Sequence, residues 1–138
     1  MIMKPIFITR QDQQRLSELI ESFRARPNGY GTNIDLLERE LSRSRIVDRN
    51  SLPENVVTMN STVRVRDLDS QESEEYTLVY PTHANPEANR LSILAPVGTA
   101  LIGSQAGDII EWPVPAGSRR LLVEDVVYQP EKAGAADL

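Results

Sequence analysis

The chain has 138 residues, 40% of them hydrophobic, so it can bury one small core and forms one domain or one domain with an appendage. Its formal net charge of −5 argues against binding to a phosphate backbone, and no sequence-specific nucleic-acid partner is expected. It has no cysteine, no sustained apolar run at its N-terminus and no stretch of about 18 apolar residues that could span a membrane. These features predict a soluble, cytoplasmic protein without a membrane partner.

The residues before position 50 carry a helical pattern. Apolar residues at helical spacing predict a first amphipathic helix with one apolar face, formed by Leu16, Leu19, Ile20 and Phe23. Thr9 and Asp12 are a plausible capping pair at its start. The segment 27–31, Pro-Asn-Gly-Tyr-Gly, ends this helix, and Thr32 or Asn33 can cap a second one.

The second helix also presents an apolar stripe. Residues at a/d spacing form it: Ile34, Leu37 and Leu41. Two short helices joined by a glycine-containing loop predict a short antiparallel helical hairpin, or coiled coil, over residues 1–50. Each helix buries only a stripe, so we expect the hairpin to lean on the second half of the chain.

From residue 51 onward the pattern is that of strands. Alternating apolar and polar residues predict strands at 63–66, 76–80, 91–95, 110–114 and 119–128. One short helix is predicted from Pro96 to about Ser104, because proline suits a first helical position. The tail 130–138 is small and polar and is expected to fray. The sequence therefore predicts an α+β protein, with the helical hairpin in 1–50 and an antiparallel β domain in 51–138.

Few side chains suggest chemistry. His83 is the only histidine and lies in a turn-rich loop, so a metal centre or a hydrolase triad is not expected. Three serines have no acid–base partner near them in the sequence: Ser92, Ser104 and Ser118. The glycine spacing at 98, 103 and 107 fits neither nucleotide-binding pattern, and Gly98 is better explained by a close backbone approach. We therefore expect a protein that is not an enzyme and holds no cofactor or metal.

Two charged groups have simple interpretations. The carboxylates between residues 67 and 75 are best explained as a solvated hairpin turn. Four arginines could gather on neighbouring strands, namely Arg64, Arg66, Arg119 and Arg120. They form either a solvated strand face or a docking patch for an acidic surface.

The most informative stretch is 91–113, LSILAPVGTALIGSQAGDIIEWP. Its order of strand, Pro-x-Gly, short helix, Gly-Asp and strand resembles the C-terminal domain of the bacterial Gre transcript-cleavage factors. The segments VVTMNSTVRVRD (56–67) and TLVYP (77–81) make it more similar to the Rnk branch of this family. The resemblance implies a β domain like FK506-binding proteins that grips RNA polymerase at the outer rim of its secondary channel. In Gre factors a coiled coil enters that channel and its acidic tip helps to hold a catalytic magnesium ion.

The resemblance assigns partner binding to one loop. We call it the docking loop, and its predicted contacts with RNA polymerase are Ser92, Ala95, Pro96, Val97 and Gly98. Pro96 would fix the backbone, Gly98 would allow close approach, and Val97 would present an apolar anchor. The alternative is that the loop only turns the chain and that Val97 belongs to the core.

This chain departs from the Gre design at the hairpin. Residues 27–33 contain no carboxylate, and Arg24 and Arg26 beside them would repel a metal ion. Each helix has about 14 residues and spans roughly 20 Å, about half of a Gre coiled coil. We therefore expect a regulator that competes with Gre factors without stimulating transcript cleavage.

Two other functions compete with this interpretation. The first is a regulator that acts directly on another protein, such as nucleoside diphosphate kinase, because the name of the Rnk branch stands for regulator of that kinase. A prolyl isomerase is disfavoured, because only 5% of the residues are aromatic and both phenylalanines lie in the N-terminal half. The sequence sets no oligomeric state.

Overall fold

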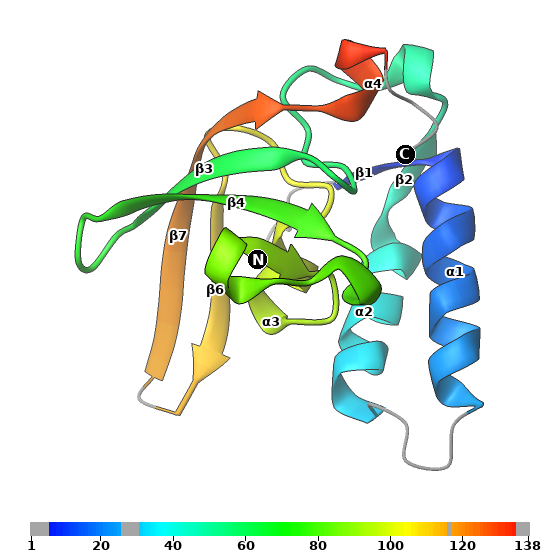
Figure 1. Cartoon of the computed structure of the whole chain (residues 1–138), viewed down its shortest axis with the longest axis horizontal. Coiled ribbons are helices and arrows are strands. Elements are labelled where there is room, and N and C mark those ends of the chain that lie inside the picture. The colour runs from blue at the N-terminus through cyan, green and yellow to red at the C-terminus, as the bar shows by residue number, and fades with distance from the viewer. Residues whose placement is uncertain (1–5, 26–30, 116, 135–138) are drawn as a thin grey trace.

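The computed structural model describes residues 6–25, 31–115 and 117–134, and its elements are drawn in Figure 1. The strands are β1 (Phe7–Thr9), β2 (Arg45–Val47), β3 (Thr62–Asp67), β4 (Ser73–Val79), β5 (Arg90–Ser92), β6 (Ile109–Val114) and β7 (Gly117–Tyr128). The α-helices are α1 (Arg10–Arg24), α2 (Gly31–Arg43), α3 (Pro96–Leu101) and α4 (Pro130–Ala133). Short 3-10 turns are η1 (Arg49–Ser51), η2 (Pro81–His83) and η3 (Pro86–Ala88). The chain is an α+β protein with helices first and a sheet after them.

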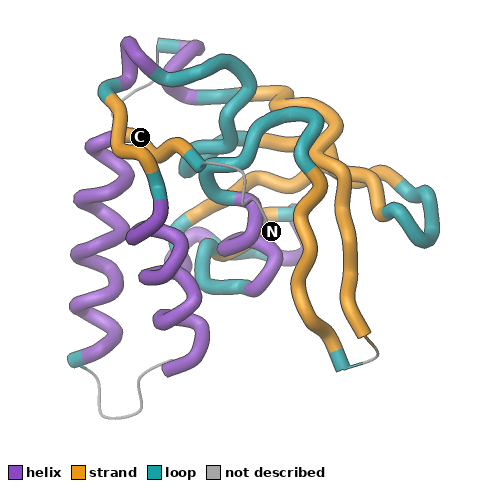
Figure 2. The backbone as a smooth tube through the Cα atoms, turned by 180° about the vertical axis from the view of Figure 1, so that it is seen from behind, coloured by secondary structure: helices purple, strands orange, loops and turns teal. Residues whose placement is uncertain are grey.

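Helices α1 and α2 lie side by side, as Figures 1 and 2 show from opposite directions. The predicted cap of α1 is confirmed, because the Asp12 amide donates to Thr9 Oγ1 over 3.1 Å. The predicted caps of α2 are wrong, since the helix begins at Gly31 and includes Thr32 and Asn33. Several candidate caps stand in a row here, and a cap signal alone does not fix which one starts the helix.

A small parallel sheet, absent from the sequence prediction, joins the outer ends of the two helices. Strand β1 leads into α1 and β2 follows α2, with Ile8 opposite Ile46 in the register. The Phe7 amide also donates to the carbonyl oxygen of Gly103 over 3.2 Å. Strand β1 therefore ties the helices to the loop that follows α3.

The main sheet has the order β5-β4-β3-β7-β6, with β3 in the middle. The prediction of an antiparallel sheet is corrected at one edge, because β5 pairs with β4 in parallel, with Leu78 opposite Leu91. Residues 80–89 connect the end of β4 to the start of β5. This connection returns the chain to the other end of the sheet, so that β5 can run parallel to β4. The loop contains η2 and η3, which the turn-rich sequence favours.

A second short helix also corrects the prediction of a single one. Helix α4 occupies the start of the segment that was expected to fray. Gln129 donates from Nε2 to the Val56 carbonyl oxygen over 2.8 Å, and Thr58 Oγ1 donates to Glu131 Oε1 over 2.7 Å. These contacts span more than 70 residues of sequence, so no local pattern could predict that they hold this segment in place.

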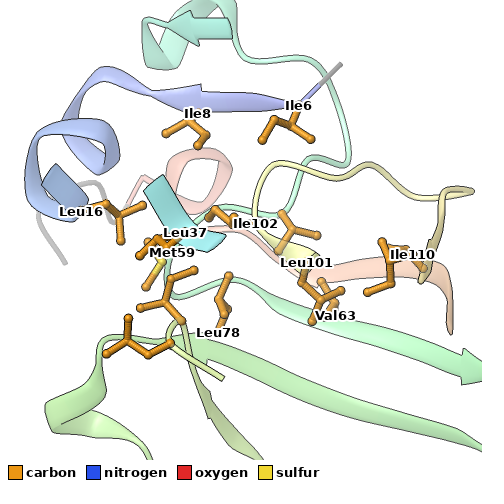
Figure 3. Packing of buried hydrophobic residues seen from close by; sticks show 14 of the residues in the cluster. Ile6, Ile8, Leu16, Leu37, Met59, Val63, Leu78, Leu101, Ile102 and Ile110 are labelled. Carbon is orange, nitrogen blue, oxygen red and sulfur yellow. The ribbon is translucent and has the colours of Figure 1, made fainter. Parts of the chain in front are cut away.

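The helices and the sheet share one hydrophobic core (Figure 3). Ile8 and Leu16 from the first elements pack with Leu78 from β4 and Leu101 from α3, and all four are at most 1% exposed. Leu37 of α2 is also fully buried in this cluster. Burial of large aliphatic side chains stabilises folded proteins by about 1.5–3 kcal/mol each. The helix pair is therefore fixed to the sheet by the interior of the protein.

Candidate functional site

The docking loop is held by its own hydrogen bonds. Ser92 Oγ accepts from the Leu94 amide over 3.0 Å, and the Ala95 amide donates to the Ser92 carbonyl over 3.0 Å. Thr99 Oγ1 donates to the carbonyl oxygen of Ile93 over 2.7 Å. Pro96 occupies the first position of α3, as predicted, where its missing amide hydrogen costs nothing. The loop is thus a preformed turn between β5 and α3.

Gly98 is buried behind this turn. A Cβ atom at this position would lie 2.2 Å from the Ser92 carbonyl oxygen, a distance that real side chains do not tolerate. The predicted close backbone approach is therefore present, and it is made to the chain's own backbone. Gly98 sets the shape of the loop, whereas Ser92, Ala95 and Pro96 reach its surface.

Val97 is partly buried and partly accessible, so neither of the two interpretations that the sequence left open is excluded. It is half-buried against the core, and it lines a hollow of about 270 Å³ that we call the α3 groove. Apolar side chains from five elements form its floor: Val65, Tyr76, Leu91, Val97 and Leu121. Val65 and Leu121 are nearly fully buried, while the other three are partly exposed. The groove thus presents apolar surface beside the docking loop.

The rim of the α3 groove is mainly acidic. It is formed by Asp67, Ser70, Glu72, Glu74 and Arg119, so three carboxylates face one guanidinium. Arg119 donates to Asp67 Oδ2 over 2.5 Å, which leaves the two glutamates to set the sign of the rim. The arrangement suits a partner segment that brings positive charge together with an apolar side chain.

The protonation states on the rim are well defined. Backbone amides of Ser70 and Asp69, together with the Arg119 guanidinium, hold the pKa of Asp67 below its usual value. Burial and a hydrogen bond to Glu74 raise the pKa of Tyr76 to about 12, so its phenol stays protonated. Asp67 therefore remains an anion and Tyr76 remains neutral at physiological pH.

The four arginines lie on the neighbouring strands β3 and β7, but they do not form one patch, because Arg119 faces the α3 groove and the next residue, Arg120, faces the other side of the sheet. Each of the four has an acidic partner. Their ion pairs are Arg64–Glu75, Arg66–Glu124, Arg119–Asp67 and Arg120–Asp69. Such pairing favours the solvated strand face over a docking patch for an acidic surface.

The remaining polar candidates have structural roles. Ser104 is buried and donates to the Leu101 carbonyl oxygen, and His83 is exposed in η2. Among the described residues no three His, Cys, Asp or Glu side chains gather as metal ligands. No helix in the described ranges is long and apolar enough to cross a membrane.

Sequence reasoning named only Val97 among the residues of the groove floor. Tyr76 and Val65 were predicted to lie on strands, and their alternation fixed a face for each. Which strands would lie side by side was not visible in that pattern. The register of β3 between β4 and β7 brings Val65, Tyr76 and Leu121 to one hollow.

Comparisons with known proteins agree with this architecture. The family model "Transcription elongation factor, GreA/GreB, C-term" matches residues 52–128, and the model "Rnk N-terminus" matches residues 4–47. The chain belongs to the GreA/GreB family, in its Rnk branch. The resemblance predicted from the sequence is therefore confirmed.

Individual proteins of this family are similar to the chain over much of its length. The "Regulator of nucleoside diphosphate kinase" of Escherichia coli K12 is 40% identical over 131 residues, which cover 94% of this chain and 93% of the relative. A GreA of Clostridium botulinum strain Hall is 42% identical over 90 residues, which cover 65% of this chain and 56% of that GreA. A solved "Prokaryotic transcription elongation factor GreA/GreB from Nitrosomonas europaea" is 42% identical, with a TM-score of 0.73 over 91% of this chain and 100% of that one. These Rnk and Gre proteins are named as regulators or elongation factors and not as enzymes.

Proposed function

We propose that this protein binds RNA polymerase near the secondary channel and competes there with Gre factors, without stimulating transcript cleavage. The main observation in support of this proposal is that the docking loop lies beside the α3 groove, within the segment that matches the Gre C-terminal family model. The loop is held by its own hydrogen bonds and exposes Pro96, while the groove offers an apolar floor with an acidic rim. A preformed surface of this kind loses little conformational entropy when a partner binds.

The proposed interaction has two physical parts. An apolar side chain of the polymerase would sit over Val97, Tyr76 and Leu91, and central apolar contacts of this type carry most of the energy in interfaces. Positive charge on the same segment would face Glu72 and Glu74 and would accelerate encounter. The net charge of −5 supports a basic protein segment as partner.

The helix pair supports the absence of cleavage stimulation. Helix α1 has 15 residues and α2 has 13, which correspond to about 22 Å and about 20 Å. Near the tip, Arg24 bonds Asp35 over 2.8 Å and Glu38 over 2.9 and 3.0 Å, so both carboxylates already neutralise a cation of the chain. The predicted tip residues 27–30 and Arg26 lie outside the described residues. A short pair with occupied carboxylates is a poor holder for a catalytic ion.

Competition for core RNA polymerase tests the docking site. Tagged polymerase would be saturated with this protein, and a Gre factor would be titrated as competitor. Val97→Asp and Pro96→Ala should weaken competition, provided that circular dichroism shows folded protein. Val127→Asp, at a residue 46% exposed and outside the groove lining, serves as the control. A folded Val97→Asp protein that competes at full strength would remove the loop from the interface.

A direct regulator of nucleoside diphosphate kinase is the second candidate. The printed name of the Escherichia coli relative is the observation that favours it. Purified kinase would be assayed with and without an excess of this protein, in the absence of polymerase. A change in kinase activity would support direct action, whereas unchanged activity together with polymerase binding would exclude it.

We also propose the finer architecture that the family suggests. Residues 1–50 would be an antiparallel hairpin of the coiled-coil type, and residues 51–138 a domain like FK506-binding proteins, in a cytoplasmic protein. The sheet wrapping around α3 in Figure 1 supports the second assignment. A fragment from residue 51 onward should give a β-type circular dichroism spectrum, and a mainly helical spectrum would contradict this division.

A further inference from the structure

A second hollow, the α1 hollow, is lined by residues of α1, of the end of β4 and of η2, which follows that strand. Thr77 and Val79 line it, whereas Tyr76 lines the α3 groove. Because successive residues of a strand face opposite sides, the two hollows lie on opposite faces of β4. Its volume of about 790 Å³ falls in the range of small-molecule sites.

The α1 hollow brings two arginines together on an acidic protein. Arg15 of α1 and Arg90 of β5 line it beside His83 of η2, and Glu18 is the one carboxylate among the described lining residues. Arg90 is fixed by a pair of backbone bonds with Asn85, each 3.0 Å long, while its side chain is exposed. A guanidinium on a rigid backbone is a good donor to carboxylate or phosphate oxygens.

Part of the lining is apolar. Leu19 of α1, Val79 of β4 and Tyr80 line the hollow, and Val79 is only 4% exposed. Burial raises the pKa of Tyr80, so the phenol remains neutral and does not oppose an anion. Arg15 lies near this ring, yet the Tyr80 hydroxyl is buried without a well-formed hydrogen bond in the described structure. Hydroxyl and amide groups complete the lining: Ser22, Asn60, Thr77 and Thr82.

We propose that the α1 hollow binds a small organic anion that carries a carboxylate or phosphate group on an aromatic body. Arg90, with Arg15 beside the same hollow, would bind the charged group, and Leu19, Val79 and the Tyr80 ring would cover the body. None of the docking-loop residues lines this hollow, so the site is separate from the proposed docking loop. Because the lining comes from α1 and from the sheet, the bound anion would hold the helix against the sheet.

The whole chain, labelled with ¹⁵N, would be titrated with four probes and followed by amide chemical shifts. Phenyl phosphate and benzoate carry both features, inorganic phosphate lacks the aromatic body, and benzyl alcohol lacks the charge. One of the two aromatic anions should saturate, with shifts centred on α1, η2 and β5. It should bind at least about tenfold more tightly than inorganic phosphate. Comparison of phenyl phosphate with benzoate distinguishes the two charged groups.

Substitutions of Arg90, which is exposed, test whether the anion binds in the α1 hollow. Arg90→Ala should weaken the binding of the tighter aromatic anion by about tenfold, which is the loss of affinity expected when one charge-assisted hydrogen bond is removed. Arg90→Lys should recover part of it, and Arg39→Ala, an exposed arginine of α2 outside the hollow, should change nothing. The proposal is overturned if neither aromatic anion saturates by about 10 mM. It is also overturned if inorganic phosphate binds equally well, or if Arg90→Ala leaves binding unchanged.

Discussion

Replacing Asp12 by asparagine tests the electrostatics of the junction between α1 and the sheet. Asp12 is 6% exposed, and its Oδ2 accepts from the Met59 amide over 3.0 Å. Burial is the main cause that raises its pKa from 3.8 to about 6, and the charge of Glu131 adds to the effect. Hydrogen bonding to Met59 and the charge of Arg15 act in the opposite direction. The ionised carboxylate is therefore held in an unfavourable place.

The size of the effect follows from this pKa. The difference between 3.8 and about 6 corresponds to at most about 3 kcal/mol, at about 1.36 kcal/mol per unit. Since the folded state binds the proton more tightly, the stability from Asp12 is fully present below pH 3.8 and is lost as pH rises through about 6. When the pH is lowered from about 8 to about 5, protonation of this residue should raise the free energy of unfolding by about 1.4 kcal/mol.

Asparagine keeps the acceptor for Met59 and removes the charge. Asp12→Asn should therefore raise the free energy of unfolding by up to about 3 kcal/mol at about pH 8 and by about half of that at about pH 5. Urea denaturation at both pH values measures this, with Asp125→Asn on exposed β7 surface as control. The reasoning is refuted if the Asp12→Asn protein is no more stable than the parent at pH 8, or if its gain does not shrink toward pH 5.

Further changes test the shared core, the loop and the C-terminus. Leu16→Ala should lower the free energy of unfolding by about 2–5 kcal/mol in urea denaturation, because Leu16 is fully buried between α1 and the sheet. An unchanged midpoint would contradict the shared core. Gly98→Ala should cost at least about 1–3 kcal/mol, since its Cβ would collide with Ser92, and a neutral effect would show that the loop yields. Removal of residues 129–138 should lower the melting temperature by breaking the Gln129–Val56 bond. On backtracked elongation complexes the intact protein should leave RNA lengths as polymerase alone does, and robust shortening would contradict the proposed function.

Local patterns predicted the elements that depend on near neighbours. The helical spacing of Leu16, Ile20 and Phe23 corresponds to α1, and the Thr9 cap is made by residues three positions apart. The alternation around Val63 and Val65 corresponds to β3. These signals survive in the structure because an amphipathic segment must turn its apolar side inward in any packed fold.

Long-range contacts decided the rest. Strands β1 and β2 are three residues each and have too little pattern to be seen, yet they pair because the helices bring Ile8 and Ile46 together. The parallel edge of the sheet depends on the path of residues 80–89, and α4 depends on contacts with Val56 and Thr58. Each of these three features joins residues that are far apart in the chain, and local sequence patterns do not specify which distant segments pair or in which register.

The sequence by itself determined an α+β chain of the GreA/GreB family and the turn between a strand and a short helix at Pro96, because family motifs and periodicity are local properties. Only the tertiary structure decided that Val97 faces both the core and a groove, and that the neighbour of Gly98 is the chain's own Ser92. It also decided that Arg15 and Arg90, 75 positions apart, line one hollow. The physical reason is that a binding surface is made where strands and helices meet, and their meeting is fixed by the burial of the whole core.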